Sequence, residues 1–242
     1  MPKNFSIKIK RYDPGTGKIW FETHKVPADP KLTILDAVRA INEGKQASVS
    51  HRSSCQMGIC GSCGAIVNGK PVLMCSTFCK DLKTPITIEP LKNFPIVKDL
   101  VVDTDNAMDK MREALPYTTY ATSKSKSASK QTPRQLNRIK ETSQCIKCML
   151  CYSACPIFGL DKEFIGPAAI ATGWRYNKDT RDKITNKRMD SLTSKDGVWK
   201  CSFIGECSNV CPKSVDPAGA IQKMKVMGVL HSAKSIVKRK KK

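Results

Sequence analysis

The cysteines constrain this chain more than any other feature of its sequence. Twelve of them stand in four groups along 242 residues, and the gaps within a group are only two to five residues long. The first ten residues, MPKNFSIKIK, contain no apolar stretch typical of a secretory signal, so we expect the chain to be made and kept in the cytoplasm. Disulfides are rare in that reducing compartment, and closely spaced cysteines there indicate metal ligation.

Length and charge set further limits. A chain of 242 residues favours two domains, and a hydrophobic share of 40% is enough for ordinary cores. No stretch approaches the ~18 consecutive apolar residues that a membrane span needs. The formal charge of +21 indicates acidic partners, anionic lipid headgroups or nucleic acid, and by itself it does not choose among them.

The first part of the chain has the pattern of a small sheet with one helix. Residues 5–10 alternate between apolar and polar types, and the segment IWFETHKV follows after a turn, which predicts a β-hairpin. A capping-box pattern begun by Thr33 predicts a helix. Asn68-Gly69 predicts a second hairpin, and PITIEPL a last strand. We therefore expect an α+β domain over residues 1–104.

The remainder divides into a connection and a helical domain. Residues 105–135 are expected to form the connecting segment, because TSKSKSASKQTPRQ is a Lys/Ser-rich linker without a core-forming pattern. Residues 136–242 are expected to be helical, with Asp216 and Pro217 starting the last helix and KSIVKRKKK ending the chain as a basic tail.

The first cysteine group has the spacing of plant-type ferredoxins. Cys55, Cys60 and Cys63 are separated by four and two residues, and a fourth thiolate further on completes a 2Fe–2S site. We favour Cys75, because it ends the strand that returns from the second hairpin turn, and we expect Cys79 to be a small buried apolar residue. A zinc site is the weaker alternative, because zinc favours close pairs of cysteines. The glycines that let the backbone approach the cluster are Gly58, Gly61 and Gly64.

The helical domain contains two runs of cysteines. The first, CIKCMLCYSACP, is the bacterial-ferredoxin run, whose fourth cysteine binds the other cluster in two-cluster proteins. The second, CSFIGECSNVCP, has the same pattern with one cysteine missing. By the crossing rule, the expected 4Fe–4S ligands are Cys145, Cys148, Cys151 and Cys211, and the ligands of the other site are Cys155, Cys201 and Cys207.

The missing cysteine determines the type of the third cluster. Ile204 stands where a complete run would have a thiolate, so only three thiolates face that site. We expect a 3Fe–4S cluster there, and the alternative is a 4Fe–4S cluster with a water or serine ligand. Loss of one thiolate charge raises the reduction potential, which suits a late electron acceptor.

At these motifs the chain resembles the iron–sulfur subunits of succinate:quinone oxidoreductases, most closely the fumarate reductase branch. The resemblance runs through RSSCQMGICGSCGAIVNGKPVLMC, CIKCMLCYSACPIFGLDKEFIGPAAI and GVWKCSFIGECSNVCPKSVDPAGAI. It implies a β-grasp plant-type ferredoxin domain followed by an all-helical bacterial-ferredoxin-like domain. It also implies a flavoprotein partner with covalent FAD, membrane-anchor subunits, a quinone, no nucleic acid, and a place on the cytoplasmic face of the inner membrane.

The resemblance implies a role for each of these parts. Electrons pass between FAD, the 2Fe–2S, 4Fe–4S and 3Fe–4S clusters and quinone, during succinate oxidation to fumarate or the reverse. The chain itself has no flavin-binding or dicarboxylate-binding signature, so it is not catalytic alone. The quinone pocket of relatives lies beside the trinuclear cluster, and without the resemblance Lys225 would be expected on a solvated basic face. The residues at matching positions are Pro156, Ser202, Phe203, Gln222 and Lys225.

The sequence leaves two alternatives open. One is the iron–sulfur subunit of another flavin-linked reductase, such as a thiol-linked fumarate reductase, whose relatives have an additional cysteine-rich domain. The other is a zinc-binding nucleic-acid-binding protein, which the high positive charge suggests. Metal analysis with EPR separates the zinc alternative from an iron–sulfur protein, because an iron–sulfur protein is brown with EPR signals from three centres, whereas a zinc protein is colourless and binds DNA with a steep salt dependence.

Overall fold

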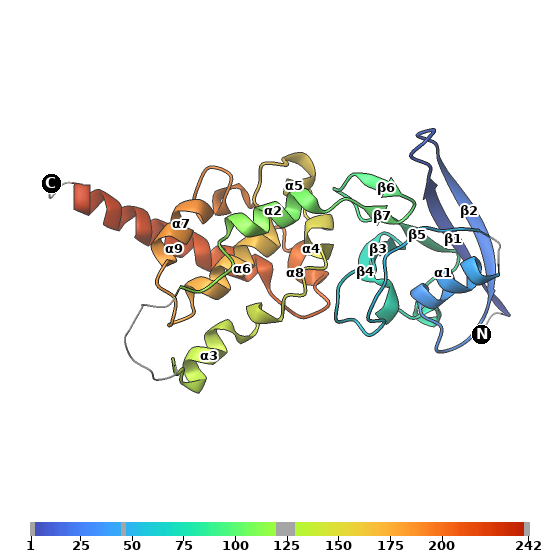
Figure 1. Cartoon of the computed structure of the whole chain (residues 1–242), viewed down its shortest axis with the longest axis horizontal. Helices are drawn as coiled ribbons and strands as arrows, with labels where there is room; N and C mark the ends of the chain where they lie inside the picture. Colours follow the sequence, from blue (N-terminus) through green and yellow to red (C-terminus); the bar gives the residue numbers. More distant parts are fainter. Residues whose placement is uncertain (1–2, 45–46, 120–128, 240–242) are drawn as a thin grey trace. The chain divides into compact units, whose positions relative to one another are not determined.

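The computed structural model describes residues 3–44, 47–119 and 129–239, and Figure 1 labels its helices and strands. Part of the linker expected within residues 120–135 and the end of the basic tail lie outside these ranges. The chain forms two compact units. The first consists of Met1–Thr104 with Ile146–Ala154, and the second of Asp105–Cys145 with Cys155–Lys242.

The first unit is built on a mixed five-stranded sheet with the order β2-β1-β5-β3-β4. β1 pairs antiparallel with β2 and parallel with β5, while β3 pairs antiparallel with both β4 and β5. This unit also contains the short helix α4, Leu150–Ser153, and the small hairpin of β6, Ile96–Lys98, and β7, Val101–Val102. The strands of the main sheet are β1 (Asn4–Tyr12), β2 (Ile19–Pro27), β3 (Gly64–Val67), β4 (Lys70–Leu73) and β5 (Ile86–Glu89).

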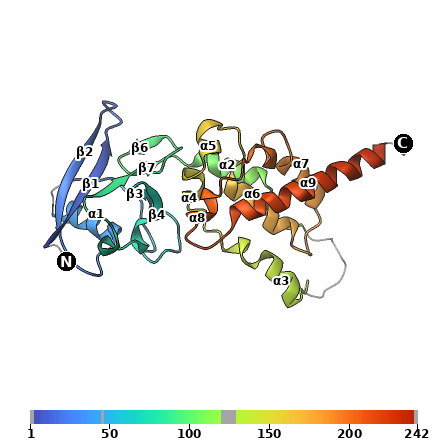
Figure 2. The same ribbon diagram turned by 180° about the vertical axis from the view of Figure 1, so that it is seen from behind.

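The sequence patterns explain these elements. In β1 every second residue from Phe5 onward is buried, which is the period of a strand with one face in the core. Helix α1, Ile34–Glu43, begins with a capping box in which the Thr33 hydroxyl accepts from the Asp36 N–H and the Asp36 carboxylate accepts from the Thr33 N–H. The helix packs on β2 and on the turn Met74–Ser76 (Figures 1 and 2).

A buried ion pair fixes the segment that leads into the first cysteine loop. The Asp99 carboxylate accepts from Arg11 Nε at 2.8 Å and from the Ser50 backbone N–H at 2.8 Å. The Ser50 carbonyl in turn accepts from the Leu100 N–H at 3.1 Å. Because Asp99 is 1% exposed, its charge requires these partners, and they hold residue 50 against the sheet five positions before Cys55.

The second unit is helical. The final helix, α9, packs mainly on α6, also contacts α7 and α8, and continues past the other helices of its unit (Figures 1 and 2). The prediction of an α+β domain followed by a helical domain is confirmed. The helices are α2 (Asp105–Glu113), α3 (Pro133–Lys140), α5 (Pro156–Leu160), α6 (Pro167–Asn177), α7 (Thr185–Leu192), α8 (Glu206–Asn209) and α9 (Pro217–Arg239).

Candidate metal centres

The loop that begins at Cys55 turns its backbone N–H groups toward cysteine sulfurs. Cys55 Sγ accepts from the N–H of Ile59 at 3.3 Å and of Cys60 at 3.2 Å. The Gly58 N–H donates to Cys75 Sγ at 3.3 Å, and Gly58 has a φ of +67°, a conformation that favours glycine. Such donors stabilise negative charge on sulfur, so this loop fits a cluster held by thiolates.

Two of the four cysteines predicted for this site, Cys60 and Cys63, have pKa values shifted by their surroundings. Hydrogen bonding with the Ser62 hydroxyl, and then with backbone N–H groups, lowers the pKa of Cys60 to about 6. Burial, reinforced by the nearby Cys75 and Cys60 sulfurs, raises the pKa of Cys63 to about 11. The Ser62 hydroxyl lies 3.1 Å from Cys60 Sγ, a contact that sequence reasoning missed. Cys60 and Cys75 therefore lie close enough to affect the Cys63 thiol, and the Cys60 N–H donates to Cys55 Sγ.

Cys79 has a different environment. Its side chain is completely buried, and burial followed by the charge of Asp36 raises its pKa to about 11. No other cysteine influences its pKa, in contrast to Cys63. This is the environment expected of a small buried apolar residue.

Part of the first four-cysteine run packs within the first unit. Gly61 has a φ of +75°, and a Cβ placed on it would lie 2.9 Å from the Cys148 Cβ and 3.0 Å from the Ile146 carbonyl oxygen. The Ser153 hydroxyl accepts from the Lys92 N–H at 2.9 Å, which fixes the other end of this segment. Cys148 therefore lies directly against the first cysteine loop, and only glycine fits at position 61.

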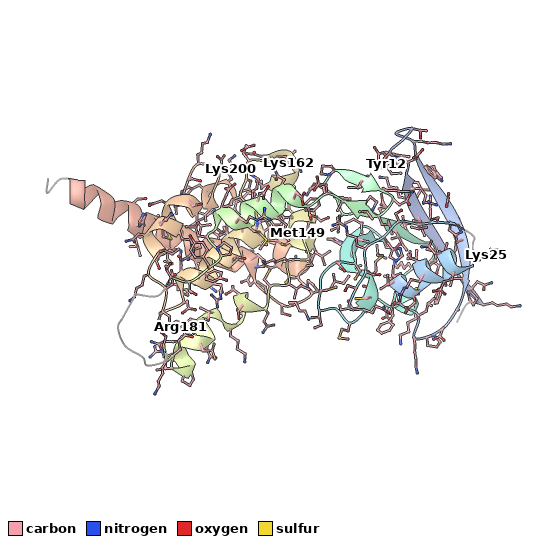
Figure 3. All side chains as sticks on the ribbon, in the orientation of Figure 1. Tyr12, Lys25, Met149, Lys162, Arg181 and Lys200 are labelled. Carbon is pink, nitrogen blue, oxygen red and sulfur yellow. The ribbon has the colours of Figure 1, made fainter. Side chains whose placement is uncertain are left out.

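The two runs share a backbone conformation as well as a spacing. In each run the residues two and four positions after the first cysteine have positive φ: Lys147 and Met149 in one, Phe203 and Gly205 in the other. In each run a four-residue helix, α4 or α8, begins five positions after that cysteine. Met149, labelled in Figure 3, is 3% exposed in spite of its left-handed backbone. Ile204 thus occupies the backbone position that Cys148 has in the first run.

The second unit brings three of the predicted ligands together. Cys155, Cys201 and Cys207 line one small cavity. Burial, and then the charges of Cys155 and Cys201, raises the pKa of Cys207 to about 12. The Phe203 N–H donates to Cys201 Sγ at 3.4 Å, and the Phe158 N–H donates to Cys155 Sγ at 3.5 Å. The sulfurs and their donors fit a cluster with three thiolate ligands.

The predicted quinone residues divide into two sets. Pro156, Ser202 and Phe203 line the cavity of the three cysteines, as does Ile204. Lys225 does not line it, and its Nζ donates to the Cys201 carbonyl at 2.7 Å. Gln222 Nε2 is buried and has no hydrogen-bond partner within the described residues.

The remaining predicted ligands belong to both units. Cys145 and Cys211 pack against a buried cluster of Ala171, Val215 and Ala220 in the second unit. Cys148 and Cys151 belong to the first unit. Across the part of the chain that the structure describes, no three or more His, Cys, Asp or Glu side chains are gathered closely enough to hold a single metal ion.

The comparisons with known proteins identify the family of this chain. Residues 6–109 match the model of a 2Fe–2S iron–sulfur cluster binding domain, and residues 141–215 match that of a 4Fe–4S dicluster domain. A fumarate reductase iron–sulfur subunit from Mycobacterium tuberculosis is 43% identical over 96% of this chain and 95% of the relative. One from Haemophilus influenzae is 45% identical over 91% of both chains. The chain belongs to the family of fumarate reductase and succinate dehydrogenase iron–sulfur subunits.

A solved structure supports the same assignment. A chain described as "Mycobacterium smegmatis Sdh1 complex in the apo form" superposes with a TM-score of 0.84 at 25% identity, covering 94% of this chain and 96% of that one. The predicted family, fold class and role as an electron-transfer subunit of an oxidoreductase are confirmed, as are the 2Fe–2S and 4Fe–4S domains. The zinc-binding and other flavin-linked alternatives are not favoured. None of the described helices is both long and apolar enough to cross a membrane.

Proposed function

We propose that this subunit relays electrons through three clusters with the ligand sets expected from the sequence. The observation that carries the proposal is the cavity of Cys155, Cys201 and Cys207 with Ile204 in the position equivalent to Cys148. The chain supplies three thiolates there and an aliphatic side chain where the fourth would stand. The proposed 2Fe–2S ligands are Cys55, Cys60, Cys63 and Cys75; the 4Fe–4S ligands are Cys145, Cys148, Cys151 and Cys211; and the 3Fe–4S ligands are Cys155, Cys201 and Cys207.

The clusters, when bound, accept and release one electron at a time, and the surrounding residues tune their potentials. Backbone N–H groups directed at Cys55, Cys75 and Cys201 stabilise added negative charge. Because Ile204 supplies no thiolate, the reduction potential of the third site is raised. This favours the third site as the cluster that exchanges electrons with quinone. The contact between Gly61 and Cys148 supports a short path from the first site to the second.

The test is the substitution Ile204→Cys, read by EPR and iron content of the full chain. It adds a thiolate at the equivalent of Cys148, so the EPR signal of an oxidised 3Fe–4S cluster should disappear and the iron content should rise by about one atom per chain. The matched control is Leu160→Cys, which adds a thiol to an exposed position of the same unit that does not line the cavity. An unchanged 3Fe–4S signal in Ile204→Cys would show that residue 204 does not stand at the position of the missing fourth ligand, which contradicts the proposed arrangement of the third site.

The proposed quinone pocket lies beside the third site. Pro156, Ser202 and Phe203 line the cysteine cavity, and the buried Gln222 amide has an unused donor. Lys225 supplies a cation whose ammonium group reaches the backbone of Cys201. A quinone oxygen that gains negative charge on reduction needs such donors.

The proposed partners are a flavoprotein with covalent FAD and membrane-anchor subunits, with the complex on the cytoplasmic face of the inner membrane. Family membership supports a membrane-associated complex. Helix α9 adds support, because Val226, Val229 and Leu230 are 63%, 58% and 58% exposed and the sequence after them is strongly basic. Apolar side chains followed by lysines suit contact with a membrane-embedded partner and its anionic lipids.

A further inference from the structure

The helical unit has a second cavity, and none of the proposed cluster ligands or quinone residues lines it. It measures about 380 Å³ and shares no lining residue with the cavity of the three cysteines. Trp174, in its wall, packs against the same buried cluster as Cys145 and Cys211. The cavity lies among α3, α6 and α9, and it is lined by Asn137, Arg138, Glu141, Thr142, Trp174, Lys178, Asp216, Ala220 and Lys223.

Three cations from separate parts of the unit face this cavity. Arg138 comes from α3, Lys178 follows α6 and Lys223 comes from α9. Within the described ranges none of these side chains donates a hydrogen bond or forms an ion pair of 4.0 Å or less. Burial, and then the charge of Arg138, lowers the pKa of Lys178. Like charges held together without hydrogen-bond acceptors are stabilised by a bound anion.

The two carboxylates in the lining are already engaged. The Asp216 carboxylate accepts from the Ser208 hydroxyl at 2.6 Å and from the Gly219 N–H at 2.9 Å, which caps α9. The Glu141 carboxylate accepts from the Asp216 N–H at 3.0 Å. Against the effect of burial, the hydrogen bonds from Ser208 and Gly219 and then the positive charge of Lys223 lower the pKa of Asp216. Within the described residues, Arg138 and Lys178 form no ion pair of 4.0 Å or less with a carboxylate.

The Trp174 ring restricts which ligands can bind in this cavity. The ammonium groups of Lys178 and Lys223 lie 4.5 Å and 5.9 Å from the centre of the Trp174 ring. Because these cations already occupy positions over the ring, stacking of a nucleotide base is disfavoured. A compact oxyanion suits the site better, since a guanidinium and two ammonium groups are preferred donors to phosphate.

We propose that this cavity binds a phosphate group through Arg138, Lys178 and Lys223. The inference goes beyond the electron relay and does not depend on the cluster ligands. Two sources supply such a group: a free phosphate or small phosphate ester, and the headgroup of an anionic phospholipid. The two sources share the recognition chemistry and are separated by experiment.

The first arm is calorimetric titration of the cluster-containing full chain with inorganic phosphate at constant ionic strength. The variant Arg138→Gln/Lys223→Gln removes two of the three cations, and we expect phosphate affinity to fall by about tenfold for each charge removed. The control, Arg134→Gln/Lys187→Gln, removes equal charge from exposed positions of α3 and α7 that do not line the cavity. It should bind phosphate as the unmodified chain does.

The second arm measures cosedimentation with phosphatidylcholine vesicles, with and without phosphatidylglycerol. Phosphate binding that only the cavity variant loses supports the site with free phosphate as its source. Vesicle binding that requires phosphatidylglycerol and that only the cavity variant weakens supports the site with a lipid headgroup. Absence of binding in both arms overturns the proposal, and so does equal weakening in the cavity and control variants, which would show only a general effect of charge.

Discussion

At the scale of single residues, Gly61 is the tightest position of the first cysteine loop. A Cβ there meets both Cys148 and the carbonyl of Ile146, whereas a Cβ on Gly69 meets nothing within 4 Å, although both glycines have positive φ. Both Gly→Ala changes therefore have a backbone cost of about 1 kcal/mol, and Gly61→Ala has an additional steric cost of about 1–3 kcal/mol. Thermal unfolding of the full chain should show the larger decrease in Tm for Gly61→Ala. Equal decreases would contradict the close contact.

Lys225 tests the proposed quinone pocket at the same scale. Its ammonium group donates to the Cys201 carbonyl, so it lies beside the third site without lining the cysteine cavity. In the intact complex, Lys225→Ala should lower quinone-linked turnover on the order of 10- to 100-fold, because a preorganised donor to the reduced quinone is lost. Dye-linked succinate or fumarate turnover should persist.

The matched control for this prediction is Lys187→Ala, which removes an exposed lysine from α7. It should leave both activities unchanged. If Lys225→Ala lowers dye-linked and quinone-linked turnover equally, the residue has a structural role and the assignment to the quinone pocket is wrong.

At the scale of elements, one buried arginine joins α7 to the segment before the linker. The Arg188 guanidinium is completely buried and donates to the Leu115 and Tyr117 carbonyls at 3.1 and 2.9 Å. It also forms a 2.8 Å ion pair with the buried carboxylate of Asp182, which accepts from the Thr119 N–H. This network orders residues 115–119, which have little regular structure of their own.

Substitution of this arginine should be strongly destabilising. Arg188→Met leaves the Asp182 charge and two carbonyls buried without their donor, which costs about 3–5 kcal/mol. Urea unfolding of the full chain measures this loss. The double variant Arg188→Met/Asp182→Asn should recover part of it, because the uncompensated charge is removed. A loss below about 1 kcal/mol in Arg188→Met would show that the network contributes little.

The sequence predicted long, regular elements better than short, irregular ones. The hairpin of β1 and β2 and the helix α1 appear where alternation and the capping box predict them. The four-residue helices α4 and α8 are too short to show a period, and their shape depends on left-handed residues such as Lys147 and Phe203, which are not glycines. The parallel pairing of β1 with β5 joins distant segments, so no local pattern reveals it.

The candidate site was likewise predictable only where the sequence has a regular pattern. Equal spacing of the two runs identified Ile204 as the missing position, and the equal backbone conformation of the runs explains why that inference was possible. The contact of Gly61 with Cys148 was not predictable, because it depends on which unit each segment joins. Lys225 was identified only through the family resemblance. Its hydrogen bond to the Cys201 carbonyl could not be predicted, because every residue has a backbone carbonyl.

At the scale of the whole molecule, eleven of the twelve cysteines are proposed cluster ligands, and the remaining one, Cys79, is proposed to be a small buried apolar residue. The fully loaded chain should therefore contain about nine iron atoms, and each cluster should be removable without the others. Cys75 and Cys79 offer a matched pair, since both are buried and lie four positions apart. Cys75 Sγ accepts from the Gly58 N–H and helps to raise the pKa of Cys63. The pKa of Cys79, in contrast, is raised by burial and by the charge of Asp36.

Cys75→Ala should therefore lower the iron content by about two atoms per chain and abolish the 2Fe–2S EPR signal, with the other two signals retained. Cys79→Ala should keep all three signals, because it removes only a small buried side chain and lowers stability by about 1 kcal/mol. Iron analysis and EPR of both variants under reducing and oxidising conditions provide the measurement. The opposite pattern, with the 2Fe–2S signal lost in Cys79→Ala and kept in Cys75→Ala, would transfer the fourth ligand to Cys79. Loss of all three signals in Cys75→Ala would show instead that the first cluster is required for the whole chain to fold.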